Sequence, residues 1–183
     1  MKKLLIPFIL IIAALFQSCT GPRGPVGPAG LDGNSGPIGQ TFEIEKVNFN
    51  AGNDWQIRQT FSAANVGLED QDIILVYILW NTTDNNQPIW RLLPQAIDMP
   101  RGITYNFDFT PLDYTVFIDA PSTVNLSTLS PNVTQNQTFR IVALPANWSN
   151  GRMSAEKVDY SDYNSVKKHF NLDESKIKKI SLN

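Results

Sequence analysis

Hydrophobic and polar residues alternate along much of the segment 42–183, as they do in strands with one buried face. The clearest run is 103–110, where Ile, Tyr, Phe and Phe alternate with Thr, Asn, Asp and Thr. The same alternation predicts further strands at 42–49, 55–61, 114–119 and 139–143. The first of these runs slips by one residue at Glu45–Lys46, which predicts a β-bulge. The pattern therefore predicts a mainly β domain.

One segment departs from alternation, because residues 73–80 are eight apolar residues in succession. A strand covered on both faces has this pattern. A polar stretch at 81–88 and a second apolar stretch at 89–93 follow it, so we predict a hairpin at the centre of the sheet. Short strands separated by turns at close intervals are typical of an antiparallel β-sandwich.

Helical spacing occurs only near the C-terminus. Tyr163, Val166 and Phe170 recur at i, i+3 and i+7, with Asp162 placed to cap the helix and Asn171 to end it. We expect this short helix to cover one face of the 73–80 strand. Residues 175–182 predict a last strand or a short helix, with outward lysines of the kind that protect a sheet edge.

The first 18 residues have the pattern of a secretory leader. Lys2 and Lys3 precede 13 apolar residues at 4–16, fewer than the roughly 20 that span a bilayer as a helix. The stretch Phe16-Gln17-Ser18-Cys19 resembles the lipobox of bacterial lipoproteins, with Phe16 at a position where leucine is usual. This resemblance implies lipidation of Cys19, and Thr20 after it favours the outer membrane. The alternative is an ordinary secretory leader with an unrelated cysteine.

Residues 19–41 predict a stalk. Seven glycines stand at a strict period of three from Gly21 to Gly39, and proline directly follows four of them. This is the collagen pattern, in which only glycine fits at the axis of three polyproline-II chains. A triple helix and a single polyproline-II tether of roughly 65 Å both remain open. No two of these glycines are two residues apart, which excludes the dinucleotide fingerprint G-x-G-x-x-G.

Composition narrows the function classes. The 183 residues fit one domain with appendages, divided as leader 1–18, stalk 19–41 and β-rich domain 42–183. One cysteine and one histidine exclude cysteine metal clusters, dithiol redox centres and multi-histidine sites, and no cofactor is expected. Loss of Lys2 and Lys3 with the leader leaves 13 basic against 17 acidic residues, a net charge of −4 without like-charge blocks. Nucleic acid is therefore not an expected partner.

Three groups of side chains are candidate sites. Glu69, Asp70 and Asp72 are crowded in one turn, and Asp54 lies in another. Oxygen-rich loops can bind calcium, but this spacing matches no calcium-loop pattern and predicts a solvated turn. His169 has no nucleophile or paired acid arranged around it in sequence and predicts a solvent-facing helix residue.

The third group is aromatic and could form a platform for sugar rings. Trp55, Tyr77 and Trp80 belong to apolar patterns, which predicts that they pack in the core. Trp90 and Trp148 are then the better candidates for a glycan platform. No catalytic or metal-binding residues are assigned.

The chain as a whole resembles the collagen-like-repeat lipoproteins of Bacteroidota, in Cys19, in 21–41, in 73–80 and 90–94, and in the 159–171 tail. The resemblance implies a cell-envelope location and carries no catalytic residues. The leading hypothesis is a non-enzymatic, lipid-anchored envelope protein with a structural or adhesive role. Its partners would be the membrane, two further copies through the stalk, and a glycan or another envelope protein. A glycan-binding module is the alternative, and a hydrolase with scattered acids is a third hypothesis.

Overall fold

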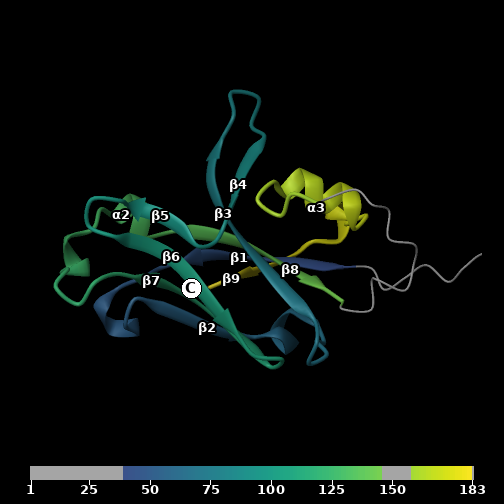
Figure 1. Ribbon diagram of the computed structural model, residues 1–183, viewed down its shortest axis with the longest axis horizontal. Helices are drawn as coiled ribbons and strands as arrows, with labels where there is room; N and C mark the ends of the chain where they lie inside the picture. Colours follow the sequence, from purple (N-terminus) through teal and green to yellow (C-terminus); the bar gives the residue numbers. More distant parts are fainter. Residues whose placement is uncertain (1–38, 146–157, 183) are drawn as a thin grey trace, which may run out of the picture. The chain divides into compact units, whose positions relative to one another are not determined.

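The computed structural model describes residues 39–145 and 158–182, all within one unit that spans 35–183 (Figure 1). The predicted leader, Cys19, most of the predicted stalk and Trp148 lie outside the described residues. The described chain is mainly β and forms two sheets, which is consistent with a β-sandwich.

The larger sheet has five strands in the order β4-β3-β8-β1-β9. Their bounds are Pro88–Leu92 for β4, Ile73–Thr82 for β3, Gln137–Leu144 for β8, Gln40–Val47 for β1 and Lys178–Ser181 for β9. The smaller sheet has the order β2-β7-β6-β5, with bounds Gln56–Thr60, Asp113–Asp119, Ile103–Phe109 and Gln95–Asp98. The described helices are α2 at Pro131–Thr134, α3 at Tyr163–His169 and short 3-10 turns at Ala51–Asn53, Phe61–Ala64, Leu126–Thr128 and Glu174–Lys176.

Alternation explains the main core, which lies between the two sheets. Phe42 and Ile44 of β1 meet Tyr114 and Val116 of β7 in one hydrophobic cluster, and the Phe42 and Tyr114 rings lie 5.7 Å apart. The predicted bulge is confirmed, because the β1–β8 register shifts between Ile44 and Val47 and Lys46 has a φ of 57°.

A second core lies on the other face of the larger sheet. Tyr77 of β3 and Val142 of β8 pack there with Tyr163 and Val166 of α3. The predicted helix is confirmed in its cap as well, since the Asp162 side chain accepts a hydrogen bond from the Asn164 backbone N–H. Strand β3 is therefore buried on both faces along its middle, as the run of apolar residues predicted.

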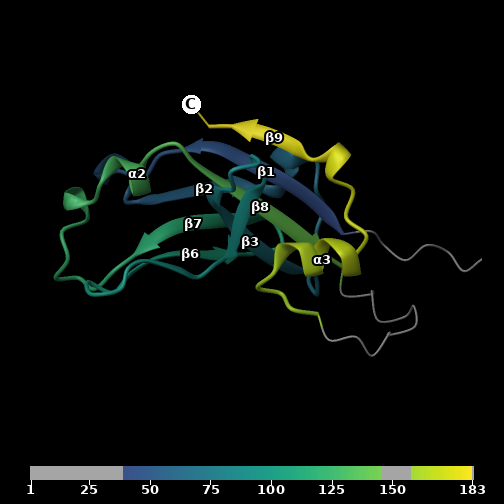
Figure 2. The same cartoon turned by 90° about the horizontal axis from the view of Figure 1, so that it is seen from above.

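Three expectations were wrong. The β3–β4 hairpin is not central, because β4 is an edge strand and β8 occupies the middle of the sheet. The described sheets are not wholly antiparallel, because β9 pairs with β1 in parallel, as Figure 2 shows at the sheet edge. Trp80 is not a core residue: β8 pairs with β3 only as far as Ile78, so Trp80 lies beyond the covered part of the strand and is 36% exposed.

The first strand also begins earlier than 42. Gln40 pairs with Ala143 and Thr41 with Val142, so the end of the predicted stalk segment is part of the sheet. Gly39 is buried, and a Cβ there would lie 2.8 Å from Leu172 Cδ2 and 3.0 Å from Leu144 Cδ2. The last glycine of the triplet series is thus packed within the β-domain.

Candidate functional site

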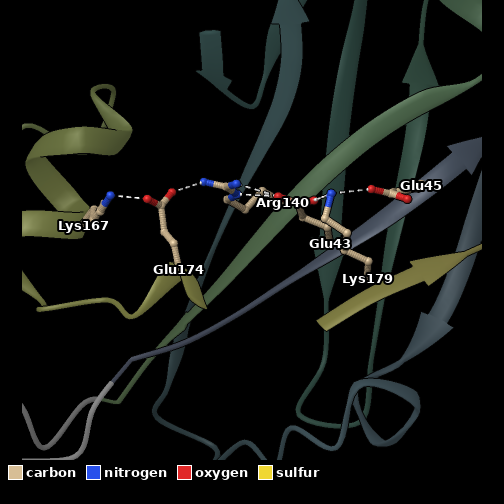
Figure 3. A network of polar contacts seen from close by, with 6 residues as sticks. All are labelled: Glu43, Glu45, Arg140, Lys167, Glu174 and Lys179. Carbon is tan, nitrogen blue, oxygen red and sulfur yellow. Dashed lines mark hydrogen bonds and ion pairs between the residues drawn. The ribbon is translucent and has the colours of Figure 1, made fainter. Parts of the chain in front are cut away.

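The outer face of the five-stranded sheet carries a row of side chains that crosses all five strands. In register, Lys179 of β9 lies beside Glu43, Glu43 beside Arg140, Arg140 beside Tyr77, and Tyr77 beside Leu92. The row changes from charged to apolar as it passes from the β9 edge toward β4. Its charged half forms the most extensive polar network of the described chain (Figure 3).

Arg140 is the centre of this network. Its Nε and Nη2 atoms donate to Glu43 Oε1 at 2.9 Å and 2.6 Å, and Nη1 donates to Glu174 Oε1 at 2.8 Å. The Arg140 and Glu43 side chains are only 8% and 3% exposed. Charges buried this deeply are tolerated because each has an opposite charge and hydrogen bonds.

Lysines complete the network at both ends. Lys179 Nζ lies 3.1 Å from Glu43 Oε2 and 2.8 Å from Glu45 Oε1, and these bonds to Glu45 and Glu43 raise the Lys179 pKa. Lys167 of α3 pairs with the second oxygen of Glu174. Burial raises the Glu174 pKa, but the bonds from Lys167 and Arg140 outweigh it, so the net pKa is lowered. The network therefore joins β1, β8 and β9 to the α3 segment.

Two aromatic rings enclose the guanidinium. Arg140 Cζ lies 4.1 Å from the Trp90 ring centroid and 4.6 Å from that of Tyr163, within the range of cation–π attraction. Burial raises the Tyr163 pKa to about 12, and Arg140 acts in the opposite direction. Tyr77, whose pKa burial also raises, donates from its hydroxyl to the Tyr160 carbonyl at 2.7 Å.

This arrangement joins the C-terminal segment to the sheet. Every carboxylate oxygen of Glu43 and Glu174 has a cationic neighbour, and the described network contains no serine, threonine or cysteine nucleophile. It is an ionic clamp between the sheet and residues 158–182, with a buried centre at Arg140 and Glu43 and more exposed ends at Glu174 and Lys179.

Of the predicted glycan platform, the structure describes Trp90 alone. The Trp90 ring is half-buried between β4 and α3, beneath Arg140 and 6.2 Å from the Tyr163 ring. Its Nε1 is buried without a hydrogen-bond partner among the described residues. The pairing with Trp148 stays a prediction.

The acidic turn and His169 were both predicted to be exposed to solvent. Glu69 and Asp70 are exposed in a turn, and the Asp72 carboxylate accepts from the Glu69 backbone N–H at 3.0 Å. His169 is half-buried, with its ring 4.8 Å from that of Phe170. Within 39–145 and 158–182, no three histidine, cysteine, aspartate or glutamate side chains are grouped to hold a metal ion.

A cleft of about 460 Å³ opens beside the start of β1. Thr41 and Phe42 of β1, Ala64 and Val66 after β2, and lysines of the C-terminal segment line it. Both lysines have partners, since Lys176 pairs with Asp173 and Lys178 donates to the Ala63 carbonyl.

Helices long and apolar enough to cross a membrane are not found among the described residues.

The ionic clamp was not predicted from the sequence. The signal was present in β8, where Arg140 shares its outward face with Val142 and Leu144. A strand apolar on both sides of an arginine indicates that the arginine is covered, and a covered arginine requires a carboxylate.

Searches against family models, curated proteins and solved structures gave no match for this chain.

Proposed function

We propose that this protein is a non-enzymatic, lipid-anchored protein of the bacterial cell envelope that presents its β-domain on a collagen-like spacer. The lipobox-like stretch ending at Cys19 and the seven glycine triplets support the anchor and the spacer. Thr20 favours the outer membrane as the location. The role of the domain is structural or adhesive.

The observation that carries the proposal is the junction at Gly39. The last glycine of the triplet series is buried against Leu144 and Leu172, and β1 begins at the next residue. No flexible linker therefore separates the end of the series from the sheet. A spacer that runs directly into the first strand of the domain suits display at a distance from a membrane.

The clamp supports the same use. It ties residues 158–182 to the strand that receives the spacer, because Glu43 and Glu45 of β1 bind Arg140 and Lys179. A surface-display domain benefits from having its first strand held on both sides.

The test is the chemistry of the mature N-terminus. We expect the protein from membranes to begin at Cys19, to carry acyl chains by mass spectrometry, and to incorporate labelled palmitate. Cys19→Ala should abolish the label and leave the precursor uncleaved. Thr20→Ala should still incorporate the label and should still be cleaved. A soluble mature protein that begins at another residue, without acyl groups, would overturn the anchor.

A further inference from the structure

The β3–β4 hairpin extends beyond the rest of its sheet. Strand β8 pairs with β3 only through Ile78, whereas β3 and β4 continue to pair as far as Thr82 and Pro88. Figure 1 shows this hairpin projecting from the described domain. Its two faces differ, because Trp90 turns toward α3 while Arg91 and Ile89 lie on the opposite face.

On that opposite face an indole and a guanidinium are stacked. Arg91 Cζ lies 4.3 Å from the centroid of the Trp80 ring. Trp80 remains 36% exposed with Arg91 in place, and the neighbouring Ile89 is 38% exposed. The β3–β4 register shifts between Leu79 and Asn81, so Trp80 sits in an irregularity of the strand, where β-sheets commonly redirect a side chain.

Arg91 is distinguished by its lack of an anionic partner. Among the four described arginines, Arg58, Arg101 and Arg140 each pair with a carboxylate, and Arg91 contacts no carboxylate of the described chain. The mature chain carries a net charge of −4, so an exposed arginine without a carboxylate partner in the described chain is a local positive charge on an acidic protein. A planar guanidinium matches a carboxylate in two parallel hydrogen bonds.

From this juxtaposition we propose that the Trp80–Arg91 face of the hairpin binds a polysaccharide containing uronic acids. The part of the indole that stays exposed contacts apolar C–H groups of a pyranose ring, and the guanidinium stacked over the same indole binds the sugar carboxylate. Ile89 extends the apolar surface along β4 for a neighbouring sugar. These residues are exposed on a projecting hairpin, so a long polymer can reach this face without entering a closed pocket.

The site is small, so its affinity per contact is low. One ring and one guanidinium correspond to a Kd on the order of 1 mM. Several copies displayed on one membrane would raise the avidity for a repetitive polymer without further contacts. This inference is independent of the lipid anchor, because the hairpin would bind whether or not Cys19 is acylated.

The experiment is calorimetric titration of the full chain in detergent with hexagalacturonate, and with neutral maltohexaose for comparison. We expect hexagalacturonate to bind at least about tenfold more tightly than maltohexaose, and added salt to weaken it. Arg91→Gln should lower the affinity about tenfold, and Trp80→Leu should do the same.

Arg58→Gln is the matched control, because Arg58 is also exposed on a strand but is paired with Asp113. It should leave the affinity unchanged, and Arg91→Lys should recover only part of the loss, since it restores charge without the planar fork. Should Trp80→Leu fold poorly, the comparison of Arg91→Gln with Arg58→Gln decides alone. Absence of binding to hexagalacturonate, equal binding of both sugars, or equal affinity of Arg91→Gln and the unaltered chain would overturn the proposal.

Discussion

Arg140 is one of the side chains that bind the C-terminal segment to the sheet. It is bonded to Glu43 and Glu174 and lies over the rings of Trp90 and Tyr163. A buried pair of this kind need not exceed an apolar pair in stability, but the loss of one partner leaves the other charge without compensation. Substitutions of Arg140 and Glu43 should therefore have strongly non-additive effects on the free energy of unfolding.

Arg140→Met should lower the free energy of unfolding by up to about 3–5 kcal/mol, because it removes the cation bound to Glu43 Oε1 in a site that is 3% exposed and leaves Lys179 as the cationic partner of that carboxylate. Glu43→Gln should also destabilise, and the double variant should cost clearly less than the sum of the two. Urea unfolding of the three variants measures this.

The control for this cycle is Arg58→Gln. Arg58 pairs with Asp113 at 2.5 Å, but its side chain is 69% exposed, so the expected cost is at most about 1 kcal/mol. Additive losses for Arg140→Met and Glu43→Gln would show that the two side chains are not coupled.

Alkaline pH should destabilise the domain through its buried tyrosines. Burial raises the pKa of Tyr163 to about 12 and raises those of Tyr77, Tyr105 and Tyr114 as well. The folded pKa exceeds the unfolded value of about 10, so stability is full below pH 10 and is lost as the pH rises toward the folded pKa. Urea midpoints should therefore stay constant up to about pH 10 and fall between about pH 10 and about pH 12. Phenolate absorbance of the folded protein should likewise appear at a higher pH than that of free tyrosine.

Tyr163→Phe tests the cause. This variant removes one titrating hydroxyl, so the decline of its midpoint with pH should be shallower than that of the unaltered chain. Phenolate absorbance that develops with a single pKa near 10 in the folded protein would contradict the burial of these rings.

At the scale of elements, local sequence patterns correctly predicted the features that depend on a few adjacent residues. Asp162 and the Tyr163–Val166–Phe170 spacing located α3, and the slip at Glu45–Lys46 located the bulge, because caps and bulges depend on a few adjacent residues. The edge position of β4 and the parallel pairing of β9 depend on which strands meet across the fold. Period-two alternation is the same in parallel and antiparallel strands and in central and edge positions, so it could not decide them.

The candidate sites divide in the same way. Solvation of Glu69 and Asp70 follows from their local sequence. The pairing of Glu43 with Arg140 joins residues 97 positions apart. The exposure of Trp80 depends on where the pairing of β8 with β3 stops, which is at Ile78. Neither could be read from a window around one residue.

The junction between spacer and sheet gives a prediction for two glycines. Gly39→Ala should destabilise the β-domain by about 1–3 kcal/mol, because the new Cβ would meet Leu172 Cδ2 at 2.8 Å, Leu144 Cδ2 at 3.0 Å and the Ala143 carbonyl oxygen at 3.3 Å. Gly36→Ala, one triplet earlier, is the matched control and should leave the unfolding of the domain unchanged. Thermal unfolding followed by near-ultraviolet circular dichroism distinguishes them, and equal effects of the two substitutions would show that Gly39 has no special packing role.

At the scale of the whole molecule, the burial of Gly39 shortens the length available to a triple helix. The glycines from Gly21 to Gly36 remain for the axis, and Asn34-Ser35 interrupts the proline-containing triplets. A triple helix this short, without hydroxyproline, has few interchain bonds to oppose the entropy of association. Multivalent display at growth temperature would then come from membrane density rather than from permanent trimers.

We therefore expect residues 20–183 to be monomeric at about 37 °C by light scattering, and any trimer at about 4 °C to require the glycine triplets. The deletion that tests this must stop at residue 38. Removal of 39–41 would take away the Gly39 packing and the pairing of Gln40 and Thr41 with β8, so that loss of a trimer could not be assigned to the spacer. If 39–183 still forms the trimer seen for 20–183, the β-domain itself associates, and the exposed surfaces of its two sheets become the interface to map. A trimer of 20–183 that persists at about 37 °C and disappears in 39–183 would instead contradict the argument from length and make the spacer a stable collagen helix.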